Sequence, residues 1–253
     1  MIMTPTITQA PERTNTMKAA QYEEYGDPDV LKLVEVDEPH AGSGEIRIAV
    51  RAAGVNGIDW KIRAGYMREM MPVSLPAGSG FDAAGIVDEV GDGVTDIAIG
   101  DAVFGTGSNT YAEHAVLANW ALKPDGLSFE EAAGYPVAVE TAQRILDVVG
   151  VEADQTVLIS GAAGGVGSAA VQFARARGAT VIGTASQANQ RYLEDLGATP
   201  TTYGEGLVER VRAAGPGRRR RGARPRRLRS HPRAHRADRR PLEGGLHRRL
   251  HRR

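Results

Sequence analysis

The sequence predicts an α/β protein in which a β-rich first half is followed by a parallel sheet with helices between its strands. Two observations carry this prediction. Segments 44–56, 83–91 and 100–107 alternate apolar and polar residues and are bounded by Gly or Asp, which is typical of short strands joined by turns. After about residue 138, apolar strands alternate with helical segments, which is the rhythm of a parallel sheet.

The elements of the second half follow one another closely. Their expected order is helix 141–150, strand 155–161, helix 167–178, strand 179–185 and helix 189–198. Gly150 and Gly178 are expected to end the two longer helices, because glycine readily adopts the left-handed conformation that closes a helix. In the first half, residues 17–26 predict a short strand and a glycine turn.

Four segments are therefore expected: a disordered leader over 1–16, a β-rich domain over 17–138, a parallel α/β domain over 139–217 and a tail over 218–253. The leader lacks the apolar core of a signal peptide, and the chain has no apolar run of transmembrane length. The absence of cysteine excludes disulfides and thiolate metal sites and fits a cytoplasmic protein. A hydrophobic content of 42% is enough for a globular core.

A formal net charge of zero hides two oppositely charged parts. Residues 218–253 contain 16 arginines, no lysine and two carboxylates, a charge of +14, which leaves −14 for residues 1–217. The body is therefore an acidic globular protein, and the tail is a different kind of sequence.

A glycine-rich stretch lies between an expected strand and an expected helix. Gly161, Gly164 and Gly167 are three residues apart, and without Cβ atoms they let the backbone turn tightly and approach a ligand. The N–H groups at a helix start favour an anion, so a dinucleotide pyrophosphate is the expected occupant. The alternative is that these small residues only let the helix pack closely on the strand.

The end of the next strand indicates which dinucleotide is bound. An acidic residue there would bind the ribose 2′-hydroxyl of NAD, but residues 179–193 contain no Asp or Glu, and Glu194 is the first acidic residue after the strand. Ser186, Asn189 and Arg191 could instead bind a 2′-phosphate, with Arg191 supplying positive charge. NADP(H) is therefore favoured over NAD. The alternative is that Arg191 is a solvated helix residue.

Three stretches together resemble one known family. Residues 154–175 (DQTVLISGAAGGVGSAAVQFAR) are similar to the quinone oxidoreductase signature of the medium-chain dehydrogenase/reductase superfamily. Residues 52–65 resemble its substrate-side loop, and residues 78–94 resemble its glycine segment. The resemblance runs from Met17 to about Gly217. It implies a GroES-like β-rich domain followed by a truncated Rossmann domain, that is, a parallel doubly wound sheet.

The resemblance also implies site residues. Together with those named above, the residues expected to bind the cofactor are Thr141, Gly161, Ala163, Gly164, Gly165, Val166, Gly167, Ser186, Asn189, Arg191 and Tyr203. By resemblance, Thr141 touches the nicotinamide amide and Tyr203 lies near the 2′-phosphate. Asn56 is expected to donate a hydrogen bond to the substrate oxygen, with Tyr66 as a candidate proton donor. Each residue has an alternative role in a turn or in packing; Asp59 and Lys61 are expected to pair structurally.

Departures from the zinc-dependent branch predict that no metal is bound. Asn56 and Phe81 stand where that branch has its Cys and His ligands, and Asp82 matches its glutamate. His40 and His114 alone cannot complete a zinc site, and His114 is expected to cap or pack a strand. The cofactor would then carry the hydride to a quinone or an α,β-unsaturated carbonyl, while the protein orients and polarises the substrate.

Two interpretations of the tail remain open. It could be an Arg-rich nucleic-acid arm, or a translation in the wrong reading frame. If Arg is encoded by CGN, moving the frame forward by one base lets RRRRGARPRRL become GVDAVLDLAG, which reads as the buried strand that a Rossmann sheet requires there. The frame error is favoured, so the tail is expected to be unstructured and is excluded from the fold.

Three functions follow from these alternatives. The first is an NADPH-dependent, zinc-independent reductase of quinones or enones, which the truncation could leave inactive. The second is a non-catalytic NADPH-binding relic. The third is nucleic-acid binding through the tail, which is disfavoured because the acidic body offers no basic face or aromatic platform. A small-molecule substrate, no membrane partner and a homodimer of the full-length sheet are further expectations.

Overall fold

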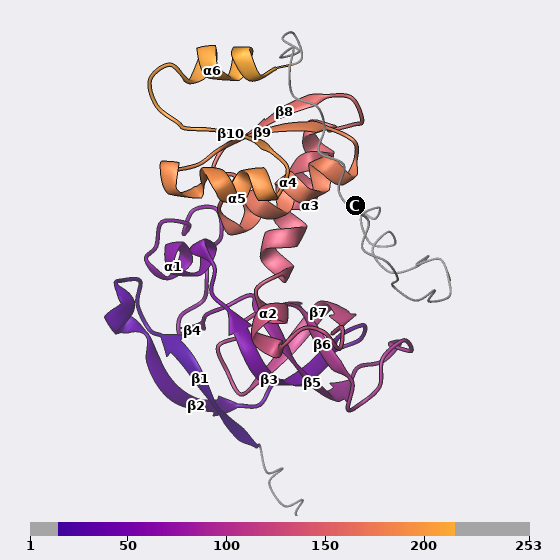
Figure 1. Cartoon of the computed structure of the whole chain (residues 1–253). Helices are drawn as coiled ribbons and strands as arrows, with labels where there is room; N and C mark the ends of the chain where they lie inside the picture. Colours follow the sequence, from indigo (N-terminus) through magenta and orange to yellow (C-terminus); the bar gives the residue numbers. More distant parts are fainter. Residues whose placement is uncertain (1–14, 216–253) are drawn as a thin grey trace, which may run out of the picture. The chain divides into compact units, whose positions relative to one another are not determined.

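The computed structural model describes residues 15–215. The expected leader, apart from its last two residues, and the expected Arg-rich tail lie outside the described residues. Four strands close into a barrel in the order β3 (Ile46–Gly54), β5 (Asp82–Val90), β6 (Ala102–Gly107) and β7 (His114–Leu122). All their pairings are antiparallel (Figure 1).

Buried and more exposed side chains alternate along β6 and along the first halves of β3 and β7, whereas the first four residues of β5 are all buried. The core of the barrel contains Ile46, Ile48, Val87, Val103 and Leu117, each at most 1% exposed. Alternation of this kind points one side of a strand inward, and closing the sheet removes its edges. The strands expected over 44–56, 83–91 and 100–107 are therefore confirmed.

A second antiparallel sheet has the order β2 (Lys32–Asp37), β1 (Thr16–Tyr22) and β4 (Ala77–Gly78). A short 3₁₀ helix, η1 (Pro28–Val30), connects β1 and β2. Tyr22 is 2% exposed and anchors β1. Strand β2 was not among the expected strands, although its residues also alternate.

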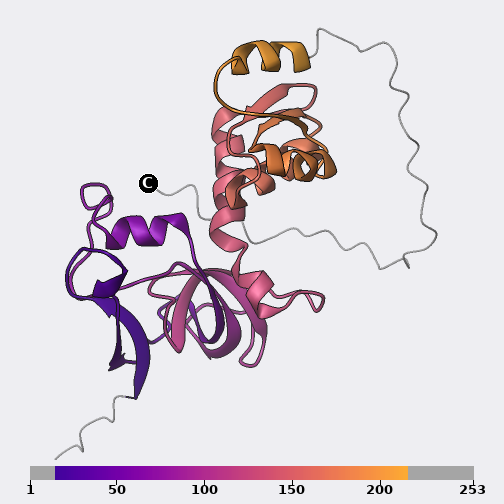
Figure 2. The ribbon, with the colours of Figure 1, turned by 60° about the vertical axis from the view of Figure 1, so that its left-hand side comes forward.

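Three α-helices occur in the chain between residue 15 and the parallel sheet. They are α1 (Gly57–Arg63), α2 (Phe129–Ala133) and α3 (Pro136–Val149). Figure 2 shows α3 as one continuous helix after the short α2. Pro136 begins α3 at a position where its missing N–H costs nothing, and Gly150 ends it with φ +69°.

The remaining strands form a parallel sheet in the order β10 (Thr199–Thr201), β9 (Thr180–Thr184) and β8 (Thr156–Ile159). Between and after them lie α4 (Gly165–Ala176), η2 (Gln187–Asn189), α5 (Gln190–Asp195) and α6 (Leu207–Ala214). The expected strand–helix order from 155 to 198 is confirmed. Gly178 ends α4 as expected, because Gly178 N–H and Ala179 N–H donate to the carbonyls of Arg175 and Ala174.

The core of this sheet lies between the strands and their helices. Val171 and Ala174 of α4, Val181 of β9 and Leu193 of α5 are at most 2% exposed. Within the described residues β8 pairs only with β9, and its Leu158 side chain is 44% exposed. Among residues 15–215, no helix is long and apolar enough to cross a membrane.

Candidate functional site

A glycine turn joins β8 to α4. Gly161 has φ +66°, a left-handed conformation that glycine adopts at little cost, and its carbonyl accepts from Gly164 N–H at 3.0 Å. Gly164 is the N-cap of α4, and Gly165 is the first helical residue. The turn expected from the sequence is therefore present, with the helix beginning directly after it.

The glycines of this turn have different tasks. A Cβ atom on Gly167 would lie 2.2 Å from the Gly161 carbonyl oxygen, so this glycine lets the helix approach the turn. A Cβ on Gly165 would meet only the Ala138 Cβ, at 3.9 Å, and one on Gly164 only the Gly161 oxygen, at 3.4 Å. Close packing therefore explains Gly167 but leaves space beside Gly164 and Gly165.

The first N–H groups of α4 have the arrangement of an anion site. Within residues 15–215, no acceptor takes a hydrogen bond from Gly165, Val166 or Gly167 N–H. Unpaired N–H groups and the helix dipole together favour a phosphate at this end. A pyrophosphate fits here, because the space that the absent side chains leave adjoins these donors.

Thr184, at the end of β9, holds the glycine turn in place. Its side-chain oxygen accepts from Gly161 N–H at 3.0 Å, and its carbonyl accepts from Ala162 N–H at 2.9 Å. Thr184 is 1% exposed. Thr184 was not among the expected site residues, although a hydroxyl at the end of a mostly apolar strand indicates a specific partner.

The residues expected around the 2′-phosphate follow the carboxyl ends of neighbouring strands. Ser186 follows β9 and Tyr203 follows β10, where Thr184 and Thr201 are register partners. Gly161 follows β8 at the same edge of the sheet. Carboxyl ends of parallel strands are where open α/β sheets bind ligands.

Two side chains that the sequence analysis missed hold these loops. The Gln190 amide donates to the carbonyls of Ala185 at 2.9 Å and Ser186 at 3.1 Å. The Arg210 guanidinium donates to the carbonyls of Thr202, Tyr203 and Glu205. The Arg210 Nε also donates to the Thr201 hydroxyl at 3.2 Å, so both side chains bind groups of the chain itself.

Arg191 itself is a surface residue of α5. Its Nε donates to Asp195 Oδ1 at 3.4 Å, and the Arg191 side chain is 85% exposed. Exposed ion pairs of this spacing stabilise a protein weakly, so this pair leaves the guanidinium able to turn toward a ligand. Asn189 and Tyr203 are also exposed.

Asn56 caps the start of α1 and is held from two sides. Its backbone N–H donates to Asp59 Oδ2 at 2.7 Å, and its side-chain Nδ2 donates to Asp82 Oδ2 at 2.8 Å. The expected pairing of Asp59 with Lys61 was wrong, because Asp59 is buried and accepts from Asn56 and from Tyr111 instead. Lys61 Nζ lies 5.8 Å from the Trp60 ring centre.

Asp82, at the start of β5, is completely buried. Its Oδ1 accepts from Val137 N–H, in the first turn of α3, at 3.0 Å. Burial raises the pKa of Asp82 to about 6, although its hydrogen bonds from Asn56 and Val137 act in the opposite direction. By resemblance Asp82 matches a glutamate of the zinc-dependent branch, but it was not among the expected site residues.

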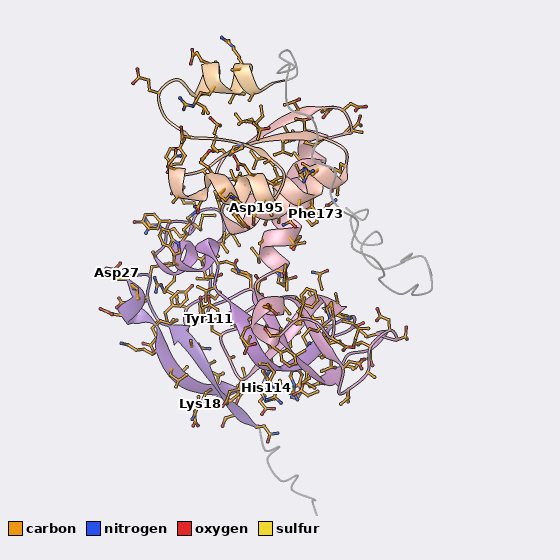
Figure 3. The ribbon with its side chains drawn as sticks, in the orientation of Figure 1. Lys18, Asp27, Tyr111, His114, Phe173 and Asp195 are labelled. Atoms are coloured by element: carbon orange, nitrogen blue, oxygen red, sulfur yellow. The ribbon has the colours of Figure 1, made fainter. Side chains whose placement is uncertain are left out.

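Tyr111, labelled in Figure 3, follows β6 and reaches α1. Its hydroxyl donates to Asp59 Oδ2 at 2.7 Å, and burial together with this bond raises its pKa. Tyr66, the expected proton donor, is 75% exposed and packs edge-on against Trp60 with ring centres 5.7 Å apart.

Thr141 lies half-buried on α3. Ala138, three residues earlier, is the residue nearest to the space beside Gly165. The first turns of α3 therefore lie close to the glycine turn, and Thr141 is one turn after Ala138 on the same helix.

His40 and His114, the histidines considered as zinc ligands, belong to no metal cluster in the described part of the chain. His114 Nδ1 lies 2.8 Å from Asp88 Oδ2, and His40 Nδ1 lies 3.1 Å from Glu89 Oε2. Between residues 15 and 215, no three His, Asp or Glu side chains are grouped closely enough to hold a metal ion. His114 is the first residue of β7, and its side chain contacts Asp88 of β5.

Two models of known protein families match the two parts of this architecture. The alcohol dehydrogenase GroES-like domain matches residues 42–145, and the zinc-binding dehydrogenase domain matches residues 165–219. A GroES-like barrel followed by a Rossmann-like sheet defines a medium-chain dehydrogenase/reductase. The chain belongs to this superfamily, and within it to the proteins similar to quinone oxidoreductases.

Individual relatives agree with this assignment. The chain is 39% identical over 200 residues to a quinone oxidoreductase of Salmonella typhimurium, covering 76% of the chain and 60% of the relative. It is 38% identical over 197 residues to a 2-methylene-furan-3-one reductase of Solanum lycopersicum, covering 72% and 50%. A mycobacterial protein solved in complex with NADPH is 36% identical, with a TM-score of 0.69, and the match covers 78% of the chain and 63% of that protein. The chain therefore spans about half to two thirds of the length of these relatives.

Proposed function

We propose that this chain binds NADPH and transfers hydride to a quinone or an α,β-unsaturated carbonyl. The observation that carries the proposal is the glycine turn, where N–H groups with no acceptor among residues 15–215 adjoin the space beside Gly164 and Gly165. The names of the Salmonella and tomato relatives support the substrate class, and the NADPH complex of the mycobacterial protein supports the cofactor.

The cofactor would be held by three groups of residues. Gly161 to Gly167, including Ala163 and Val166, would surround the pyrophosphate at the start of α4. Ser186, Asn189, Arg191 and Tyr203 would bind the 2′-phosphate, where Arg191 supplies the positive charge. Thr141 would orient the nicotinamide amide. When bound, the cofactor supplies the hydride.

The chain's own polar groups would act on the substrate oxygen. As hydride reaches the substrate carbon, that oxygen becomes electron-rich, and a donor fixed beforehand stabilises the charge. Asn56 has a second Nδ2 hydrogen beyond the one given to Asp82, and this hydrogen is the proposed donor. Tyr66 is the proposed proton donor. No metal is required for these steps.

Domain limits and location are part of the same proposal. A substrate-side domain over 17–138 and a cofactor domain over 139–217 would each contribute residues to the site, in a cytoplasmic protein. The homodimer predicted for a complete sheet stays a prediction.

Two measurements test this function. NADPH is added to the chain and its fluorescence is followed, and then NADPH consumption is measured with a quinone and with an enal. Binding and consumption are both expected. Binding without consumption of any acceptor would favour a cofactor-binding relic, and the absence of binding would overturn the proposal.

We also propose that residues 218–253 are read in the wrong frame. Their 16 arginines and the strand encoded one base away support this interpretation. Resequencing the gene around codon 217 tests it. A single gained or lost base is expected there; an intact frame ending at Arg253 would overturn the proposal, and loss of DNA binding on deleting the tail would then support a basic arm.

A further inference from the structure

Asp82 connects two elements that carry proposed site residues. One carboxylate oxygen accepts from the side chain of Asn56, at the start of α1, and the other accepts from the backbone of Val137, in the first turn of α3. Asp82 is fully buried, so no solvent competes for these two oxygens. The carboxylate therefore bridges α1 and α3 through a direct contact on each side.

The contact with Asp82 fixes which way the Asn56 amide faces. An ionised carboxylate can only accept hydrogen bonds, so the nitrogen of the Asn56 amide, and not its oxygen, must face Asp82. The Asn56 backbone is held separately, because its N–H donates to Asp59 Oδ2 at 2.7 Å. With both ends fixed, the second Nδ2 hydrogen has one defined direction.

The contact with Val137 fixes the register of α3. Ala138, the next residue, is the nearest neighbour of the space beside Gly165, and Thr141 is one turn after Val137 on the same side of the helix. A rotation or shift of the first turn of α3 would therefore move Thr141 and the wall beside the glycine turn together.

We propose that Asp82 is a positioning residue, which sets the Asn56 amide and the first turn of α3 in one fixed relationship. The proposal rests on the hydride-transfer function proposed above. Asp82 acts through Asn56 and α3 and does not itself touch the substrate.

The surroundings of Asp82 make an ionised carboxylate at this position energetically unfavourable. Asp59 from α1 and Glu140 from α3 face it with like charge, Tyr111 lies nearby, and burial opposes ionisation. Hydrogen bonds offset the free-energy cost of burying a carboxylate only in part, and an apolar residue of similar size would avoid that cost. Orientation of two site elements is a requirement that an apolar side chain cannot meet.

The test observes the Asn56 side chain directly. The chain has only five asparagines, so its side-chain amide resonance can be assigned in a nitrogen-15 spectrum by comparison with Asn56→Ser. When the pH of the unmodified chain is varied, the Asn56 amide resonance is expected to shift with a midpoint near the Asp82 pKa of about 6. Asp82→Asn should abolish this shift. Asp88→Asn, which changes a carboxylate bound to Arg47 and His114 on the barrel, should retain it.

A second readout concerns turnover. Asp82→Asn is expected to lower kcat for NADPH-dependent quinone reduction about 10- to 100-fold while KM for NADPH changes little, because misplaced groups slow the chemical step. The proposal would be overturned if the Asn56 resonance shifts neither with pH nor on the substitution Asp82→Asn. If Asp82→Asn does not fold, the titration of the unmodified chain decides alone. If that chain has no turnover, the proposed function fails, while the amide titration still decides whether Asp82 orients the Asn56 amide.

Discussion

Asp59 Oδ2 accepts hydrogen bonds from both the Tyr111 hydroxyl and the Asn56 N–H, each at 2.7 Å. Asp59 is 5% exposed, and its other oxygen is buried with no partner in the described part of the chain. The Tyr111 hydroxyl is therefore one of only two hydrogen-bond donors to this buried carboxylate among the described residues. This relationship ties the start of α1, where Asn56 lies, to the segment after β6.

Replacing Tyr111 with Phe should destabilise the protein. The substitution removes one of the two donors to a buried carboxylate, which costs about 1–3 kcal/mol of unfolding free energy. Urea unfolding measures the loss. Tyr192→Phe, at a tyrosine that is 44% exposed, is the control and should change the unfolding free energy by less than about 0.5 kcal/mol. Equal effects of the two substitutions would contradict the bridging role of Tyr111.

Substitutions in the glycine turn should separate folding from cofactor binding. Gly165→Ala places a methyl group in ordinary van der Waals contact with the Ala138 Cβ, at 3.9 Å, so the melting temperature should not fall. The same methyl group would narrow the space proposed for the pyrophosphate and should weaken NADPH binding. Gly167→Ala would place its Cβ atom 2.2 Å from the Gly161 oxygen and should lower both the melting temperature and the NADPH affinity. Melting curves and NADPH titrations of both variants provide the comparison. Unchanged NADPH affinity in Gly165→Ala would mean that the space is not used by the cofactor.

The glycine turn could be predicted from the sequence because its signals are local. The apolar strand, the three glycines and the helical pattern after them all lie within about twenty residues, and each has its own physical cause. The link between Asn56 and Asp82 could not be predicted in this way. These residues are 26 positions apart on different elements, so only the register of β3 against β5 brings them together.

Helix α1 was missed for a different reason. Residues 52–65 were interpreted as a loop by resemblance, although Asn56 and Asp59 have the spacing of a helix start. Since α1 has only seven residues, its apolar periodicity is too short to be recognised. The capping pattern was therefore the stronger signal at this position.

Arg191→Ala should reduce the preference for NADPH over NADH. If the guanidinium binds the 2′-phosphate, removing it costs about 1.5–3 kcal/mol, or about 10- to 150-fold in NADPH affinity, and leaves NADH affinity nearly unchanged. Titrations with both cofactors measure this ratio. Arg212→Ala, at an exposed arginine on α6, is the matched control. Equal losses for NADPH and NADH would place Arg191 away from the 2′-position.

The raised pKa of Asp82 predicts a pH-dependent contribution to stability. Its folded-state pKa of about 6 lies above the ordinary value of 3.8, so the folded protein binds the proton more tightly. This contribution is fully present below about pH 4 and is lost as the pH rises through about 6, despite the hydrogen bonds from Asn56 and Val137. Relative to Asp82→Asn, the unmodified chain should therefore gain about 1–2 kcal/mol of unfolding free energy between pH 7 and pH 5.

Paired urea titrations of the unmodified chain and Asp82→Asn at these two pH values isolate the Asp82 contribution, because the effects of Asp59, Glu140 and other groups largely cancel in the difference. A difference that is constant with pH would show that Asp82 titrates near its ordinary value.

Leu158 can test whether the segment encoded in the shifted frame would add a strand beside β8. It lies on β8, which pairs only with β9 among residues 15–215, and it is 44% exposed. In the 253-residue chain Leu158→Ala should therefore cost less than about 1 kcal/mol of unfolding free energy. In a chain continued in the shifted frame, a further strand would cover this edge, and the same substitution should cost about 2–5 kcal/mol. Val171→Ala, at a fully buried site on α4, should be costly in both chains. Equal costs of Leu158→Ala in the two chains would mean that the shifted-frame segment does not pack against β8.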